Sequence, residues 1–270
     1  MVGGSAARSA SGPYHLSPSS FVLKVFVLCL LSSVLKEDKG QKTKDVGLRT
    51  LDVGLWLLDF GAGFCYTTSA FTMTDLAIII LQKNEALHIR RCLEKLKPLE
   101  PRQVFVVDCL STDGSDVTAK EMGATVVYHE WPGLYAVQFN WALDHCPIQA
   151  KWVLRMDADE YLYPETICEL VQQLTDTNLS DDVSAFSLPL SRTFLGHPVK
   201  RGVGKVVLTR VFRYGIGRCE ERKMDEHITL SMGRTVALKH GFVDDNLNGI
   251  DWWTQKHLGY AAREAADLME

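Results

Sequence analysis

The sequence lacks several features that would each point to a familiar class of protein. Its seven cysteines form no Cys-x-x-Cys pair and no spacing typical of a zinc site. Positive charge is not in excess, because 29 lysines and arginines face 33 aspartates and glutamates, which gives a net charge of −4. A nucleic-acid binder usually carries a basic excess to meet phosphates, so we expect no nucleic-acid partner.

A membrane-spanning run is also missing. The stretch "FVLKVFVLCLLSSVL" (21–35) is apolar, but it is interrupted by Lys24 and is shorter than the roughly 20 residues that cross a bilayer. It is also a poor secretory signal, since its charged n-region is thin and no clear cleavage site follows. The odd number of cysteines, scattered through apolar and helical contexts, predicts buried thiols without disulfides in a reducing, cytoplasmic compartment.

The first 72 residues differ from the rest of the chain. Residues 1–20 are rich in serine, glycine and alanine, and the lysine-rich run "KEDKGQKTKD" and a short apolar patch complete this N-terminal extension. Met73 then precedes "TDLAIIIL", the first convincing strand. Two hypotheses stay open for residues 1–72: a dispensable or non-native leader before a functional domain at 73–270, or an amphipathic membrane anchor.

From Leu76 onward, strand-like and helix-like segments alternate. Continuous apolar runs predict strands at 76–81, 104–107, 124–129 and 152–156. Helices are expected after a cap at Asn84, before Gly123, at 136–146 and after Pro164. This alternation predicts an α/β fold with a mostly parallel sheet flanked by helices. The later part is less regular, with strands expected at 184–190 and 205–214 and a helix at 250–268.

Acidic side chains follow three of the expected strands. Glu85, Asp108 and the pair Asp157 and Asp159 all lie where a strand ends. Parallel sheets bind ligands beyond the carboxyl ends of their strands, so we expect these acids to meet at one edge.

The tripeptide "DAD" has the spacing of a divalent-cation site. In an extended segment, Asp157 and Asp159 would point to the same side. Two carboxylates there suit Mg²⁺ or Mn²⁺, which takes its remaining oxygens from water and a substrate diphosphate. The alternative is a solvated, aspartate-rich turn before Pro164.

Three segments together resemble a known family. "LAIIILQKNEALHIRRCL", "VVDCLSTDGS" and "WVLRMDADEYL", in this order, resemble the signature segments of family 2 glycosyltransferases with the GT-A fold. The likeness is greatest to the bacterial branch of lipopolysaccharide-core β-1,4-glucosyltransferases, and "MDEHITL" and "WWTQKHLGYAAREA" add to it. The resemblance implies a Rossmann-like GT-A domain at 73–270, with a nucleotide-sugar-binding half (73–175) and a smaller acceptor-side half (176–270). Members of this branch continue further, so we interpret the chain as C-terminally truncated.

The resemblance also implies roles for the strand-end residues. Glu85 would lie beside the nucleotide, and Asp108 would accept a hydrogen bond from the imide N–H of uracil or its equivalent. Asp113 would shape the loop or contact the ribose. Asp157 and Asp159 would hold Mg²⁺ or Mn²⁺ against the diphosphate of the sugar nucleotide. For Arg155, a cationic contact to the nucleotide sugar and a plain surface arginine both stay open.

Catalysis by a single displacement needs a carboxylate base for the acceptor hydroxyl. By resemblance, "MDEHI" supplies it, with Glu226 favoured and Asp225 second; the alternative is that both are loop-surface acids. His227 and His240 are candidates for the metal shell or phosphate, or play structural roles. Trp252, Trp253 and Tyr260 would stack on an acceptor sugar or belong to the core, and Lys256 and His257 are candidates for diphosphate contact.

The function implied is an inverting, metal-dependent glycosyltransferase. It would move a hexose from a nucleoside-diphosphate sugar, with UDP-hexose favoured, to a glycolipid, oligosaccharide or polysaccharide precursor of the cell envelope, as in lipopolysaccharide biosynthesis. A peripheral contact with the inner face of the membrane stays open. Two alternatives are a sugar nucleotidyltransferase, disfavoured because "LQKNEALH" lacks glycine, and a non-catalytic nucleotide-sugar-binding protein.

Overall fold

The computed structural model describes residues 73–201, 205–222 and 227–269. The hypotheses on residues 1–72 and on Asp225 and Glu226 therefore lie outside the described residues. The helices are α2 (Ile89–Leu96), α3 (Ser115–Glu121), α4 (Tyr135–His145), α5 (Pro164–Thr175) and α6 (Ile250–Met269), with a short 3₁₀ helix at Lys97–Leu99. The strands are β1 (Thr74–Gln82), β2 (Pro101–Asp108), β3 (Thr125–Tyr128), β4 (Trp152–Asp157), β5 (Glu160–Leu162), β6 (Val183–Phe194), β7 (His197–Pro198), β8 (Val206–Arg213), β9 (Gly217–Cys219), β10 (Ile228–Leu230), β11 (Arg234–Ala237) and β12 (Phe242–Asp244).

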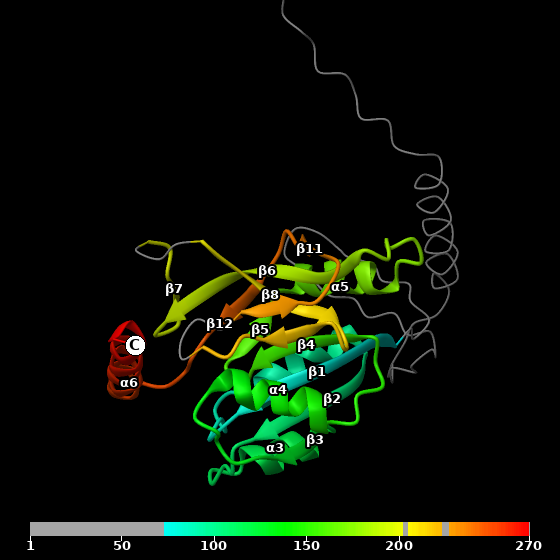
Figure 1. The fold of residues 1–270 in the computed structure, drawn as a ribbon. Coiled ribbons are helices and arrows are strands. Elements are labelled where there is room, and N and C mark those ends of the chain that lie inside the picture. The colour runs from blue at the N-terminus through cyan, green and yellow to red at the C-terminus, as the bar shows by residue number, and fades with distance from the viewer. Residues whose placement is uncertain (1–72, 202–204, 223–226, 270) are drawn as a thin grey trace, which may run out of the picture. The chain divides into compact units, whose positions relative to one another are not determined.

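Most of the described strands form one continuous sheet in the order β3-β2-β1-β4-β8-β6-β12-β5 (Figure 1). The first four are parallel to one another, and β8 joins β4 in the antiparallel sense. Because β6 is antiparallel to β8 and parallel to β12, the carboxyl ends of β6 and β12 lie at the same edge as those of β1, β2 and β4. The predicted α/β class, with a mostly parallel sheet, is confirmed.

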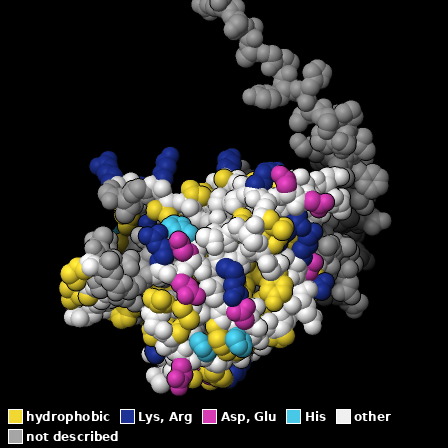
Figure 2. Space-filling model, in the orientation of Figure 1, with side chains coloured by type: hydrophobic (Ala, Val, Ile, Leu, Met, Phe, Trp, Pro, Cys, Tyr) yellow, Lys and Arg dark blue, Asp and Glu magenta, His cyan; other side chains and the backbone are white. Residues whose placement is uncertain are grey.

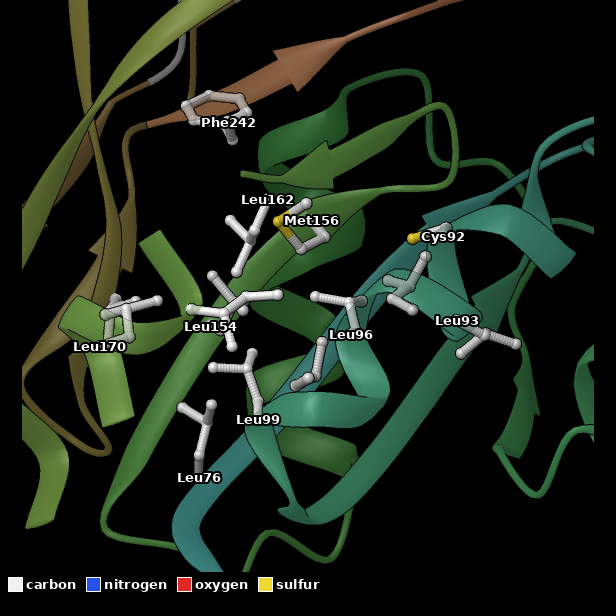
Figure 3. Close-up of a cluster of buried hydrophobic side chains, with 14 of the residues drawn as sticks. Leu76, Cys92, Leu93, Leu96, Leu99, Leu154, Met156, Leu162, Leu170 and Phe242 are labelled. Carbon is white, nitrogen blue, oxygen red and sulfur yellow. The ribbon is translucent and has the colours of Figure 1, made fainter. Parts of the chain in front are cut away.

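The sheet is covered on both faces in its parallel part. Side chains alternate along β1, so Leu76, Ile78 and Ile80 pack with residues of α2, α3 and α5, while Ala77 and Ile79 pack with residues of α4. Figure 3 shows part of the first cluster, to which α2 contributes Leu93 and Leu96 and β4 contributes Leu154 and Met156. This two-sided burial explains why the strands appear in the sequence as continuous apolar runs.

Two local predictions were wrong. Asn84 does not cap the next helix, which begins at Ile89 with His88 in the cap position. Asn84 instead has a left-handed backbone (φ 55°) inside the loop after β1. Asp157 and Asp159 do not share one extended segment, because β4 ends at Asp157 and Asp159 lies in a tight turn before β5.

The later part of the chain builds the rest of the same sheet. Strand β12 lies between β6 and β5, and it can approach β6 closely because Gly241 precedes it. A Cβ atom at Gly241 would lie only 1.8 Å from the carbonyl oxygen of Pro189. Because Gly241 has no side chain, β12 can lie close to β6. In this position the last residue of β12, Asp244, lies at the edge of the sheet.

Candidate active site

The candidate site is the edge formed by the carboxyl ends of β1, β2 and β4. From β1, the chain runs outward through β2 and β3 and then returns to β4 on the other side of β1. The point where the strand order reverses is where open α/β sheets bind ligands. Glu85 follows β1, Asp108 ends β2 and Asp157 ends β4, so the predicted convergence of strand-end acids is confirmed.

Two loops at this edge are fixed to each other by hydrogen bonds. The backbone N–H of Asn84 donates to Ser111 Oγ (2.8 Å), and Asn84 Oδ1 accepts from the N–H of Thr112 (2.9 Å). Asp113 accepts from the N–H of Ala86 (2.9 Å) through Oδ2, and its Oδ1 accepts from the N–H of Ser115 at the start of α3 (3.0 Å). These hydrogen bonds lower the pKa of Asp113 although partial burial acts to raise it. Asp113 therefore shapes the loop.

Asp108 is fully buried beneath these loops. Its Oδ2 accepts from Gln82 Nε2 (2.7 Å), and its Oδ1 accepts from the backbone N–H of Ser111 (2.7 Å). Since a carboxylate offers about four acceptor positions, further donors can still be met. Asp108 thus ties the ends of β1 and β2 to the loop that begins α3.

Glu85 takes part in a short chain of hydrogen bonds with His88 and Leu247 that the sequence did not predict. His88, 1% exposed, accepts from the backbone N–H of Leu247 through Nε2 (2.8 Å), so its proton lies on Nδ1 and is donated to Glu85 Oε2 (2.5 Å). Burial raises the pKa of Glu85, and the hydrogen bond from His88 opposes that rise. The spacing of three residues between Glu85 and His88 was the available signal.

Asp157 ends β4, and Asp159 lies in the turn between β4 and β5. Asp157 Oδ1 is buried and has no hydrogen-bond partner in the described part of the chain, while Asp159 Oδ2 accepts from Asn246 Nδ2 (2.9 Å). A buried carboxylate oxygen without a donor suits a hard divalent cation. No set of three or more His, Cys, Asp or Glu side chains among the described residues is placed to hold a metal, so a cation here would need substrate oxygens as well.

A second group of charges reaches the same edge from β12 and α6. Burial and the neighbouring Asp159 raise the pKa of Asp244 to about 6. The ammonium of Lys256 lies 3.9 Å from Asp159 Oδ2. The segment "FVDDN" after β11 is another apolar strand followed by acids, so the rule applied to the first strands could have found Asp244.

The remaining candidates are placed as follows. Arg155 is 6% exposed, lies in mid-strand with its guanidinium 5.5 Å from the ring of Phe139, and is not the surface arginine of the alternative hypothesis. His240 lies at the opposite end of β12 from the site, beside Glu169, and His227 is exposed near Glu220. Trp252 and Trp253 are 38% and 36% exposed, so the hypothesis that they belong to the core was wrong. Of the described cysteines, Cys92, Cys109, Cys146 and Cys219 are buried, as predicted, and Cys168 is half-buried.

Fold and site together define an α/β protein with acidic side chains gathered at one edge of its sheet. A family model described as glycosyl transferase family 2 matches residues 77–242, which is more than half of the chain. The chain therefore belongs to glycosyl transferase family 2. This agrees with the GT-A fold class expected from the sequence.

The curated relatives match shorter stretches. An uncharacterized glycosyltransferase of Rickettsia bellii (strain RML369-C) is 38% identical over 90 residues, or 33% of this chain and 29% of that protein. One of Rickettsia prowazekii (strain Madrid E) is 34% identical over 124 residues, or 46% of this chain and 41% of that protein. The chain thus spans well under half the length of these relatives.

Solved structures show distant likenesses. Glucosyl-3-phosphoglycerate synthase from Mycobacterium tuberculosis, in complex with Mn²⁺, UDP and glucosyl-3-phosphoglycerate, has 18% identity and a TM-score of 0.35, covering 46% of this chain and 45% of that chain. Mannosyl-3-phosphoglycerate synthase from Rubrobacter xylanophilus has 18% identity and a TM-score of 0.36, covering 48% and 43%. Likenesses of this degree say nothing about the metal or substrate of the present chain. Within the described residues, no helix is both long enough and apolar enough to cross a bilayer.

Proposed function

We propose that this chain is an inverting, metal-dependent glycosyltransferase. It moves a hexose from a nucleoside-diphosphate sugar, with UDP-hexose the first donor to test, to a glycolipid or polysaccharide precursor at the cytoplasmic side of the cell envelope. One observation carries the proposal: in a member of family 2, Glu85, Asp108 and Asp157 all lie at the reversal of strand order where such sheets bind nucleotides.

The nucleoside end of the donor belongs beside Asp108. Its two internal hydrogen bonds fix the carboxylate, and we assign its remaining lone pairs to an imide N–H of the base on the family resemblance; because Asp108 is fully buried, the loops above it would have to move for that contact. The rigid loops around Asn84 and Asp113 supply a preorganised wall for the ribose. Preorganisation of this kind lowers the entropy cost of binding.

The diphosphate belongs beside Asp157 and Asp159, which would together hold Mg²⁺ or Mn²⁺. Such a cation neutralises the charge that develops on the departing nucleoside diphosphate. Asp157 Oδ1 has no hydrogen-bond partner among the residues that the structure describes, and this supports the assignment, because a ligand there would meet a buried and unsatisfied oxygen.

Transfer with inversion also needs a base that removes the proton of the acceptor hydroxyl as the hydroxyl oxygen attacks the anomeric carbon. We assign this role to Glu226, with Asp225 as the second candidate, on the family resemblance of "MDEHI". A single displacement assisted by this carboxylate would give a β-linkage from an α-linked donor.

The proposal is tested by assaying nucleotide release from UDP-hexoses with Mn²⁺. We expect free UDP from the wild type, and a loss of about 100-fold or more in Asp157→Asn and Asp159→Asn. Asp181→Asn is the matched control, since Asp181 is an exposed acid before β6, at the other edge of the sheet. Glu226→Gln should keep donor affinity and lose transfer.

Other outcomes contradict the proposal. Release of pyrophosphate from a nucleoside triphosphate and a sugar phosphate would identify a sugar nucleotidyltransferase instead. Donor binding without turnover on any acceptor would identify a non-catalytic nucleotide-sugar-binding protein. Wild-type turnover by Asp159→Asn would remove the metal assignment.

A further inference from the structure

The start of helix α6 is clamped onto the candidate site by the segment 245–248. Arg91 of α2 donates to Asp245 through Nη1 to Oδ2 (2.5 Å) and through Nη2 to the carbonyl oxygen (2.6 Å). Asn246 donates to Asp159 Oδ2, and Leu247 donates to the buried His88. Four hydrogen bonds that involve Asp245, Asn246 and Leu247 therefore fix where α6 begins relative to the turn between β4 and β5.

Helix α6 extends from this clamp with most of its side chains exposed, and hydrophobic ones are visible at the left of Figure 2. Lys256 differs from its neighbours because it turns inward. Its ammonium lies 3.9 Å from Asp159 Oδ2, 4.7 Å from the ring centre of Trp252 and 5.8 Å from the ring centre of Tyr260. The side chain is 29% exposed. Burial disfavours its charge, but Asp159 and Tyr260 outweigh that effect and raise the pKa of Lys256.

This placement creates a conflict if Asp159 also holds a divalent cation. A dication on Asp159 would lie close to the Lys256 ammonium, and like charges at such short range in a partly buried site repel each other strongly. The conflict disappears when an anion with several oxygens lies between the two cations. A nucleoside diphosphate is such an anion, because one part can bind the metal while another meets the ammonium.

We propose that Lys256 is a positioning residue that couples metal binding to diphosphate binding. Without a diphosphate, Lys256 competes with the metal for Asp159. With a diphosphate present, both cations bind it and each favours the other. The inference rests on the proposed function, since it takes the donor diphosphate as the bridging anion. Reciprocity follows from linkage, so the diphosphate must raise the affinity for the metal by the factor by which the metal raises the affinity for the diphosphate.

The test measures Mn²⁺ affinity by electron paramagnetic resonance, with and without saturating UDP, and UDP affinity by calorimetry. Lys256→Gln should bind Mn²⁺ alone more tightly than the wild type and bind Mn²⁺ with UDP more weakly. The ratio of the two Mn²⁺ affinities should fall by roughly 10-fold or more. Lys256→Arg keeps the charge and should keep most of that ratio.

Lys120→Gln is the matched control. Lys120 also lies on a helix, 3.5 Å from a carboxylate oxygen of Asp116 and 4.9 Å from the ring centre of Tyr128, but it is on α3, outside the site. It should leave both affinities unchanged. If Lys256→Gln weakens both affinities equally or changes neither while the wild type binds Mn²⁺ and UDP together, the inference is wrong and the proposed function stands. If the wild type binds no UDP even with Mn²⁺, both fail.

Discussion

At the scale of single residues, the carboxylates of the site differ in how far the protein itself satisfies them. Both oxygens of Asp108 accept hydrogen bonds from within the protein. Oδ1 of Asp157 has no partner among the described residues. A buried polar atom without a partner raises the free energy of the folded state until a ligand meets it. Asp157 therefore has more to gain from a ligand, whereas Asp108 already stabilises the fold.

This difference gives a prediction for Asp108. In Asp108→Ala, the side-chain amide of Gln82 and the N–H of Ser111 lose their acceptor, and we expect the free energy of unfolding to fall by about 2–4 kcal/mol. In Asp108→Asn, the new side chain still accepts from Ser111, and a flip of the Gln82 side-chain amide lets Gln82 Oε1, which has no hydrogen-bond partner among the described residues, accept from the new amide. Urea unfolding should show little loss for this variant.

The two variants Asp108→Ala and Asp108→Asn also distinguish the role of Asp108 in stability from its role in ligand binding. Asp108→Asn replaces an acceptor by a donor on one side, so UDP affinity should fall while stability is kept. Equal UDP affinity in Asp108→Asn and the wild type would contradict the base contact and leave Asp108 a purely structural residue.

At the scale of elements, β4, β5 and β8 are held at the site by a buried ion pair. Glu160 Oε1 lies 2.5 Å from Arg210 Nη2 of β8, and both side chains are less than 10% exposed. The other oxygen of Glu160 accepts from the backbone N–H of Asp157 (2.9 Å). The pair thus links the turn between β4 and β5 to a strand from the later part of the chain, and the burial of both side chains makes the pair costly to break.

We expect Glu160→Gln to destabilise the fold by about 3 kcal/mol, because Arg210 stays buried without its counter-charge. The double variant Glu160→Gln with Arg210→Met should recover most of that loss, since no unpaired charge remains. Guanidinium unfolding of the single and double variants measures the interaction energy in a double-mutant cycle. Additive losses would show that the two side chains do not depend on each other.

At the scale of the whole molecule, the sequence predicts the parallel part of the fold well. Strands buried on both faces leave unmistakable apolar runs such as "LAIIIL", and Glu85, Asp108 and Asp157 follow them directly. The later part was less predictable, because short strands such as β5 and β12 gain their stability from pairing with distant residues rather than from a local pattern. The inward turn of Lys256 depends on the linker clamp, which no periodicity reveals.

Strand pairing between distant parts of the chain leads to a prediction about limited proteolysis. Residues 176–182, between α5 and β6, are mostly exposed and are a natural site for a protease to cut. The pieces should stay together after such a cut, since β4 pairs with β8 and β5 pairs with β12 across it. Size-exclusion chromatography should show one species and a denaturing gel two bands. Separate elution of the pieces would contradict the pairing.

The insertion of β12 between β6 and β5 also limits how such a protein can diversify. A new acceptor preference cannot be gained simply by exchanging everything after α5 for the corresponding segment of a relative, because that segment completes the sheet that carries Asp108 and Asp157. A chimera would have to preserve the strand pairs β4–β8 and β5–β12 and the close contact between Gly241 and Pro189. Single substitutions on exposed loops and on α6 leave those strand pairs intact, and they are the easier route to a different acceptor.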